Sequence, residues 1–293
     1  MASLKFISKE IIEKGWSGDK KYCVTDEQGN KFLLRISPIE QYERKKSEYE
    51  LMQKVASLGI PMCEPLEFGV SDEGVYSIQT WIEGAVLEDI IETLSPEQQY
   101  IYGLEAGKIL QAIHKIPVCE GLEDWEIRFN RKIDRKIKMY EECSLKYEKG
   151  QAFLNYIEKH RDLLKCRPQT YQHGDYHIGN MMIGKDNKLY VIDFNRNDFG
   201  DPWEEFNRIV WCAGCSSLLS TGMVNGYFDN DVPLIFWQLL ALYISSNTLS
   251  SLPWAIPFGS GEVEVMINQA NDILHWYDDM QNVIPVWYKG IIK

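Results

Sequence analysis

Over residues 1–90, apolar and polar positions alternate in short runs, which is the pattern of half-buried strands. One longer segment, residues 40–58, instead repeats apolar residues every three or four positions, which indicates a helix that Gly59 and Pro61 end. The turn sequence DEQGN at residues 26–30 joins two of the strand-like runs and predicts a hairpin. The expected strands are residues 5–8, 21–25, 31–36, 66–70 and 75–82.

From Ser95 onward the pattern changes to the period of helices. Ser95 followed by Pro96 predicts a helix start, because a serine side chain caps the first amides and proline fits the first helical position. The fold class expected is therefore α+β, with strands and one helix in residues 1–82, a connector at 83–94, and a helical part at 95–293. The expected helices are residues 95–114, 124–146, 151–165, 203–219, 232–250 and 262–281.

A basic stretch, residues 128–138, holds six basic residues and one acid. Apolar Phe129, Ile133, Ile137 and Tyr140 recur within and just after it at spacings of four, four and three. This period predicts an amphipathic helix with a solvated basic face rather than a nucleic-acid surface.

The strongest chemical signal is HGDYHIGN at residues 173–180, followed by Ile-Asp-Phe at 192–194. Phosphoryl transfer to an alcohol needs a carboxylate that accepts the hydroxyl proton and hard oxygens that hold Mg²⁺ on the nucleotide phosphates. In this interpretation Asp175 is catalytic, and Asn180 and Asp193 hold the metal. The alternative is a polar loop whose acids only cap turns, but four fixed residues at fixed spacing favour the motif.

The segment between the two metal ligands supports this placement. Residues 180–183 and 189–193 have strand character, and the sequence GKDNK lies between them. They predict a hairpin, which would bring Asn180 and Asp193 close together as ligands of one site.

Composition limits the classes of partner. With 45% hydrophobic and 25% charged residues among 293, the chain is typical of a soluble globular protein. The longest apolar stretch, residues 232–244, is interrupted by Pro233 and Gln238 and is too short to span a bilayer. Since the amino terminus also lacks an apolar signal region, we expect a cytoplasmic protein without a membrane partner. The net charge of −12 argues against a nucleic-acid partner.

The seven cysteines are scattered along the chain and do not form a disulfide framework. Cys212 and Cys215 have the spacing of a redox or zinc half-site, but no second pair accompanies them. We expect both to be small buried residues on a helix.

The motif HGD-x₄-N followed by IDF resembles the catalytic segment of the aminoglycoside phosphotransferase and choline-kinase-like superfamily of small-molecule kinases. Protein kinases carry His-Arg-Asp and Asp-Phe-Gly at the equivalent places, so Gly174 and Asn195 favour the small-molecule branch. The resemblance implies a bilobal, protein-kinase-like fold over almost the whole chain. It also implies an antiparallel amino-terminal sheet with one main helix, a mostly helical second lobe, and Mg²⁺-dependent transfer from ATP or GTP.

The resemblance also assigns parts of the nucleotide site. The segment Gly15–Asp19 is similar to the family's phosphate-positioning loop, in which glycine lets backbone amides approach phosphate oxygens. The end of the last amino-terminal strand resembles the hinge that binds the purine edge. The residues expected to contact the nucleotide in these two places are Ser17, Gly18, Thr80, Trp81 and Ile82.

Arg35 is the main departure from the family pattern, because it occupies the position of the strand lysine that reaches the nucleotide phosphates. Its expected partner is Glu48 on the following helix, with Glu50 in reserve. A guanidinium keeps the charge but not the shape of an ammonium group. The choice between ATP and GTP therefore stays open, and so does a nucleotide-binding pseudokinase that serves as an interaction module.

The acceptor is predicted from charge. Residues 193–293 hold twelve acids and four bases, a net charge of −8 out of −12, and an acidic cleft concentrates cations. Six tryptophans in the same region offer faces for sugars or cations. We expect a small hydroxylated, cationic acceptor, with an aminoglycoside-type antibiotic first and a macrolide, a sugar or choline next; an acidic surface that only keeps the protein soluble is the alternative.

The segment at residues 200–205 resembles one that braces the catalytic loop and opens onto the acceptor pocket. Asp201 fits equally well as a cap for the helix that Pro202 begins. His114, by contrast, is interpreted as a buried core histidine. The acids assigned to the acceptor are Asp201, Glu204, Glu205, Asp278 and Asp279.

Overall fold

The computed structural model describes residues 5–13, 18–118 and 121–292, and the chain divides into two compact units. The first unit comprises residues 1–87 and 179–196, and the second comprises residues 88–178 and 197–293. The segment that carries Asn180 and Asp193 thus groups with the amino-terminal residues, although the second unit intervenes in sequence. The lobe ranges expected from the sequence, 1–82, 83–94 and 95–293, stay a prediction.

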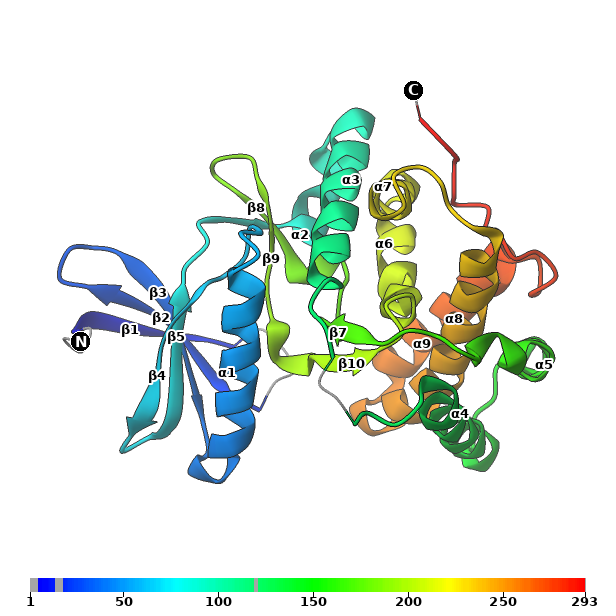
Figure 1. The fold of residues 1–293 in the computed structure, drawn as a ribbon, viewed down its shortest axis with the longest axis horizontal. Helices are drawn as coiled ribbons and strands as arrows, with labels where there is room; N and C mark the ends of the chain where they lie inside the picture. Colours follow the sequence, from blue (N-terminus) through cyan, green and yellow to red (C-terminus); the bar gives the residue numbers. More distant parts are fainter. Residues whose placement is uncertain (1–4, 14–17, 119–120, 293) are drawn as a thin grey trace. The chain divides into compact units, whose positions relative to one another are not determined.

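The first unit is built on a five-stranded antiparallel sheet with the order β1-β2-β3-β5-β4 (Figure 1). Asp26 closes the turn between β2 and β3, because its carboxylate accepts hydrogen bonds from the amides of Gln28 and Asn30 at 2.9 and 2.8 Å. The expected strands and this hairpin are confirmed. The strands are β1 (Phe6–Ile12), β2 (Lys20–Asp26), β3 (Lys31–Ser37), β4 (Pro65–Ser71) and β5 (Gly74–Thr80).

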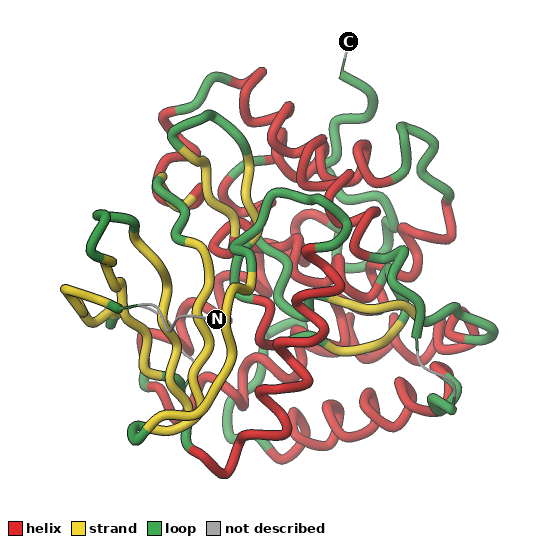
Figure 2. The backbone as a smooth tube through the Cα atoms, turned by 60° about the vertical axis from the view of Figure 1, so that its left-hand side comes forward, coloured by secondary structure: helices red, strands yellow, loops and turns green. Residues whose placement is uncertain are grey.

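One long helix, α1 (Tyr42–Ala56), packs against the sheet of the first unit. It buries Met52 and Val55, and Tyr49 contacts Phe68 of β4 with 5.3 Å between ring centroids. The expected helix at residues 40–58 is therefore confirmed, with a 3₁₀ turn over its first residues. Figure 2 shows this red helix beside the yellow strands of the unit.

The predicted hairpin of residues 180–193 is also present in the first unit. Strands β8 (Met181–Gly184) and β9 (Leu189–Val191) pair with each other, and β6 (Gly84–Val86) pairs with β8. A side chain at position 84 would place its Cβ 2.1 Å from the carbonyl oxygen of Ile183, so this close approach requires glycine. Strand β6 lies in the segment that the sequence indicated only as a connector.

The second unit is mainly helical. Helices α3 and α7 lie side by side in Figure 1 and approach closely at two glycines, because a Cβ on Gly103 would lie 2.9 Å from the Cα of Gly222. Two short strands, β7 and β10, pair antiparallel beside the helices. The elements are α2 (Leu87–Ile90, at the border of the two units), α3 (Pro96–Ile113), α4 (Trp125–Glu142), α5 (Gly150–His160), β7 (Thr170–Gln172), β10 (Asp198–Gly200), α6 (Ile209–Cys215), α7 (Ser217–Tyr227), α8 (Leu234–Ala255) and α9 (Ser260–Trp276).

Two expectations for the second unit were wrong. The helix expected at residues 203–219 breaks at Ser216, whose extended backbone and hydroxyl cap the start of α7 through the amide of Leu219. Cys212 is buried in α6 as expected, but Cys215 is exposed at its end. Among the described residues, no helix is both long and apolar enough to cross a membrane.

Candidate active site

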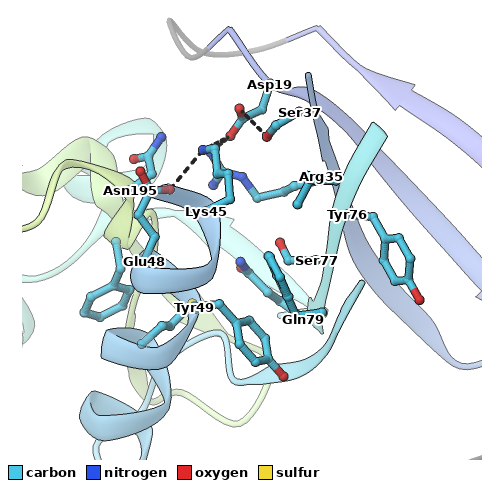
Figure 3. A pocket seen from close by; sticks show the side chains of 14 residues that line it. Asp19, Arg35, Ser37, Lys45, Glu48, Tyr49, Tyr76, Ser77, Gln79 and Asn195 are labelled. Atoms are coloured by element: carbon cyan, nitrogen blue, oxygen red, sulfur yellow. Dashed lines mark hydrogen bonds and ion pairs between the residues drawn. The ribbon is translucent and has the colours of Figure 1, made fainter. Parts of the chain in front are cut away.

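Asp19 is the centre of a charged network in the first unit (Figure 3). Its carboxylate accepts hydrogen bonds from Lys45 at 2.8 Å, from Ser37 at 2.8 Å and from Arg35 at 3.1 Å. Burial alone would raise the pKa of Asp19, but the hydrogen bonds from Lys45 and Ser37 and the two nearby cations outweigh it and lower that pKa. The network therefore holds Asp19, the last residue of the expected phosphate loop, in its charged form.

Arg35 connects this network to the expected metal ligand. Its second nitrogen donates to Asp193 at 2.7 Å, and only 8% of the Arg35 side chain is exposed. Asn195 completes the contact: with its amide oriented to satisfy both neighbours, it donates to Asp193 and accepts from Arg35, each at 2.9 Å. Burial lowers the pKa of Arg35, but Asp193 and Asp19 reverse this and raise it, so the guanidinium is a permanent cation.

The pair expected between Arg35 and Glu48 is replaced by another. Glu48 accepts from Lys45, three residues earlier on α1, at 2.9 Å, and also pairs with Arg44 at 2.9 Å. Lys45 therefore joins Glu48 to Asp19, and Arg35 turns to the carboxylates of Asp19 and Asp193 instead. The expectation failed because helical spacing alone does not show which of several cations near a glutamate reaches it.

The hairpin brings the two expected metal ligands to one end, as the sequence predicted. The amide of Ile192 donates to the carbonyl oxygen of Asn180 at 3.0 Å, and Asp193 follows directly. Asp193 adopts a left-handed backbone with φ of 67°. A carboxylate and an amide oxygen are hard donors that suit Mg²⁺ together with phosphate oxygens, so the residues present fit this ion.

The other expected nucleotide contacts lie in the same unit. Ser17 is outside the described residues, whereas Gly18 lies in the bend that leads into β2. Thr80 ends β5, where its amide and hydroxyl bond to the backbone of Glu64 at 2.9 and 2.8 Å. Trp81 and Ile82 follow Thr80 beyond the sheet, where a hinge is expected. Their contacts with a purine stay a prediction.

Asp175 lies in the second unit, in the loop after β7. Its carboxylate is 3.4 Å from Nε of Arg208 and 3.7 Å from Nε2 of His177, and its side chain remains 16% exposed. Its amide donates to Nδ1 of the buried His173 at 3.2 Å. A partly exposed carboxylate on a firmly held backbone is suited to accept a proton from an acceptor hydroxyl.

Gly174 and Glu205 fix the start of this loop. Gly174 has φ of 83°, a conformation that strains other residues, which explains why glycine stands before the aspartate. Its amide donates to both carboxylate oxygens of the buried Glu205 at 3.0 and 3.1 Å. His114 is buried beside them and bonds to Tyr227 at 2.9 Å, as expected for a core histidine.

Asp201 is entirely buried and acts as a second brace. Arg167 donates to both of its carboxylate oxygens at 2.6 and 2.9 Å, and Tyr243 donates at 2.6 Å. The amide of Trp203 also donates to Asp201 at 2.9 Å, but the 3₁₀ helix that follows (Glu204–Arg208) has Trp203 as its N-cap and no side-chain cap, so the expectation that Asp201 caps a helix was wrong. These internal contacts favour the bracing role that the family resemblance implied over direct contact with an acceptor.

The remaining acids assigned to the acceptor have other partners. Glu204 is held by Lys132 at 3.1 Å, next to the buried Lys136, whose pKa falls to about 7 mainly because burial disfavours its charge. Asp278 and Asp279 lie in the turn after α9, where Asp279 pairs with Lys149 at 2.6 Å. Their contact with an acceptor stays a prediction.

Several residues of these two networks were missed in the sequence. Asp19 and Asn195 were named only as parts of a loop and a diverging motif, and Lys45 and Arg208 were not assigned at all. The one local signal was Lys45, which stands three residues before Glu48 and can therefore reach it on a helix. The other contacts join residues that are far apart in sequence.

Comparisons with known proteins fit this geometry. No curated protein matches the sequence. Solved structures share the fold: aminoglycoside phosphotransferase APH(4)-Ia, as a thermostable variant in ternary complex with ADP and hygromycin B, is 16% identical, with a TM-score of 0.67 over 92% of this chain and 94% of that one. Amicoumacin kinase hAmiN, in complex with AMP-PNP, Ca²⁺ and Ami, is 13% identical, with a TM-score of 0.65 and coverage of 97% and 92%. A choline/ethanolamine kinase family protein from Mesorhizobium loti is 13% identical, with a TM-score of 0.64 and coverage of 95% and 92%.

These likenesses confirm the expected protein-kinase-like α+β fold. The family itself is set by sequence, because residues 10–233 match the model of the phosphotransferase enzyme family called APH. That range includes Asp19, Arg35, Asp175, Asn180 and Asp193. The chain therefore belongs to the APH phosphotransferase family and is a phosphotransferase of the small-molecule kinase type.

Proposed function

We propose that this phosphotransferase moves the γ-phosphate of ATP or GTP to a hydroxyl group of a small molecule in a Mg²⁺-dependent reaction. The observation that carries the proposal is the end of the β8–β9 hairpin, where Asn180 and Asp193 come together and Arg35 holds the Asp193 carboxylate at 2.7 Å. A family member that keeps both oxygen ligands and orients one of them has the means to bind a metal nucleotide.

Each residue has a separate task in this proposal. Asp175 orients the acceptor hydroxyl and takes its proton, and Glu205 holds the loop that presents Asp175. Asn180 and Asp193 hold the metal, which neutralises charge on the phosphates when bound. The segment at Gly15–Asp19 and the cations on the neighbouring strands hold the phosphates, and Thr80, Trp81 and Ile82 hold the purine.

For the acceptor, an aminoglycoside-type amino sugar is the first candidate. The net charge of −8 over residues 193–293 supports a cationic molecule. Among the similar structures, that of the aminoglycoside phosphotransferase APH(4)-Ia is a complex with hygromycin B. Since Asp201, Glu204 and Glu205 have internal partners, attraction would come from the field of the unit more than from these three carboxylates.

The proposal is tested by steady-state kinetics and product mass over a panel of aminoglycosides, a macrolide, choline and neutral sugar alcohols. We expect saturable phosphorylation of an aminoglycoside, with a KM that rises with salt because screening weakens the attraction. Activity only on a neutral sugar would exclude the cationic acceptor. Absence of Mg-nucleotide binding in calorimetry with both ATP and GTP would exclude the kinase reaction.

A further inference from the structure

One short 3₁₀ helix, Glu204–Arg208, contacts the loop that carries Asp175 at two points. Such a helix has three residues per turn, so side chains three positions apart lie on the same side. Glu205 and Arg208 have this spacing. Glu205 accepts from the amide of Gly174 at 3.0 and 3.1 Å, and Nε of Arg208 lies 3.4 Å from Oδ1 of Asp175. One side of this helix therefore contacts both the backbone and the reactive side chain of the loop.

The contact from Arg208 controls something that the backbone contact does not. Hydrogen bonds to Gly174 fix the path of the chain, but the carboxylate of Asp175 can still turn about χ1 among staggered positions. A proton acceptor must lie within hydrogen-bond reach of the hydroxyl, so the choice of position matters for the reaction. Nε2 of His177 lies 3.7 Å from Oδ2 of Asp175, but His177 belongs to the same loop. Arg208, in contrast, reaches the carboxylate from a separate element.

The position of Arg208 is set by contacts outside the loop. Phe206, two residues earlier, is buried, and its ring packs edge-on against Tyr227 with 5.0 Å between the ring centroids. The next residue, Ile209, is also buried and begins α6. The side chain of Arg208 is itself only 27% exposed. Its guanidinium therefore extends from the packed core of the second unit, which makes it a fixed point for the loop.

The charges around Arg208 favour its pairing with a carboxylate. Burial would raise the pKa of Glu204, but nearby cations outweigh it and lower that pKa. These cations are Lys132 and Lys136 of α4 and Arg208 itself, and Lys132 donates to Glu204 at 3.1 Å. Because three cations act on this one carboxylate, a second carboxylate beside Arg208 reduces their mutual repulsion. Asp175 provides that second carboxylate.

We propose that Arg208 is a positioning residue that holds the Asp175 carboxylate in the orientation in which it accepts the proton of the acceptor hydroxyl. This role rests on the proposed kinase function. In that reaction the acceptor oxygen bonds to the γ-phosphorus, the bond from this phosphorus to the leaving diphosphate breaks, and the hydroxyl proton passes to Asp175. A guanidinium stays protonated in proteins, so Arg208 orients the proton acceptor without exchanging a proton itself.

The test separates rate from affinity. Steady-state kinetics use the acceptor of the panel that gives the highest kcat/KM, and calorimetry gives the Kd of the Mg-nucleotide. We expect Arg208→Met to lower kcat about 10- to 100-fold, because a misplacement of about 1 Å can cost about 10²-fold, and to leave the acceptor KM and the nucleotide Kd unchanged. The matched control is Arg161→Met, which should keep the wild-type kcat. It removes the same charge from an arginine that is 22% exposed in the same unit and pairs with Asp134 and Glu158 instead.

Two further variants test whether Arg208 acts through Asp175. Arg208→Lys keeps the charge but not the geometry of the guanidinium, so it should recover part of the lost kcat. In the Asp175→Asn background the carboxylate to be positioned is gone, so Arg208→Met should change the residual kcat little. Thermal unfolding checks that each variant is folded. Crystal structures of the wild type and of Arg208→Met show the orientation of the Asp175 carboxylate directly and need no acceptor; we expect it to differ between the two.

The outcomes are distinct. A rise in the acceptor KM at unchanged kcat would make Arg208 a ligand of the acceptor and overturn the positioning role. An equal loss of kcat from Arg208→Met in the wild-type and Asp175→Asn backgrounds would show that Arg208 does not act through Asp175. If the wild type phosphorylates no acceptor of the panel, the proposed function itself fails. The crystal structures then decide for Arg208, and the same carboxylate orientation in the wild type and in Arg208→Met would overturn its role.

Discussion

The buried carboxylates of the two units differ in how they are paired. In the first unit, Asp19 and Asp193 share cations: Arg35 binds both, and Lys45 also binds Asp19. In the second unit Glu205 and Asp201 have separate partners: Glu205 accepts from the amide of Gly174, and Asp201 accepts from Arg167. Of Asp175, Asp201 and Glu205, only Asp175 keeps an exposed fraction that allows direct contact with an acceptor.

Because of this difference, we expect substitutions in the first unit to lower stability and substitution of Asp175 in the second unit to lower activity. In a shared network, removal of one charge leaves others buried and uncompensated, so the free energy of unfolding should fall. In the second unit Glu205 and Asp201 hold the backbone around Asp175. Loss of the Asp175 carboxylate should therefore lower the reaction rate without changing the fold.

The largest effect is expected for Asp175→Asn, which removes the proton acceptor and keeps the shape. Turnover should fall by roughly 10²–10⁴, while the affinity for the Mg-nucleotide changes little. Steady-state kinetics on an identified acceptor and calorimetry with the nucleotide measure the two quantities. The matched control is Asp162→Asn, whose side chain is 86% exposed in the same unit. Wild-type turnover in Asp175→Asn would show that another group accepts the proton.

For stability, the largest effect is expected in the first unit. Asp19→Ala leaves Arg35 and Lys45 without a shared anion, and removal of one partner of a buried pair costs about 3–5 kcal/mol. Urea unfolding measures the change in free energy. The double variant with Lys45→Met should recover part of the loss, because it removes one of the stranded cations. A loss below about 1 kcal/mol would show that solvent compensates these charges.

The fold class and the hairpin that carries the expected metal ligands were predictable because their signals are local. Residues 173–180 form one short motif, and the hairpin that returns Asp193 toward Asn180 has its turn residues between two strand-like runs. The network around Asp19 was not predictable in the same way. The network depends on the strand register that places Arg35 near Asp19, and on the contact between Arg35 and Asp193. Neither can be predicted from the spacing of residues within one segment.

Lys136 on α4 shows a different limit. Its charge placed it on a solvated basic face, but only 8% of it is exposed, and its ammonium group bonds to Asn247 of α8 at 3.3 Å. The period shows which residues face the main core. Lys136 lies on the buried face of α4 with Phe129, Ile133 and Tyr140, at spacings of three and four, so its charge rather than its spacing led to the wrong expectation.

Lys136→Met should therefore stabilise the protein at neutral and lower pH. In the folded state the pKa of Lys136 is about 7, against 10.5 without burial, so the full cost of charging it applies below pH 7. Between pH 7 and 10.5 the unfolded chain holds this proton and the folded chain does not, so wild-type stability rises with pH. We expect a gain of a few kcal/mol at pH 6 that shrinks toward pH 10.5.

Urea unfolding of Lys136→Met and the wild type at several pH values measures this difference. Lys138→Met is the matched control, because the Lys138 side chain is 72% exposed on the same helix, and it should show no such trend. A gain that is constant with pH would mean that packing, rather than the charge, limits stability at this position.

The smallest effect is expected for Ser37→Ala, which sharpens the comparison at a single hydrogen bond. The hydroxyl of the buried Ser37 donates to one oxygen of Asp19 at 2.8 Å, whereas Lys45 and Arg35 bind the other oxygen. Without Ser37 the first oxygen loses a donor, but the ion pairs remain, so the loss should be about 1–2 kcal/mol. Urea unfolding measures it against Ser8→Ala on the edge strand β1 as the control. If Ser37→Ala lost as much stability as Asp19→Ala, the network would depend on the orientation of the Asp19 carboxylate more than on its charge.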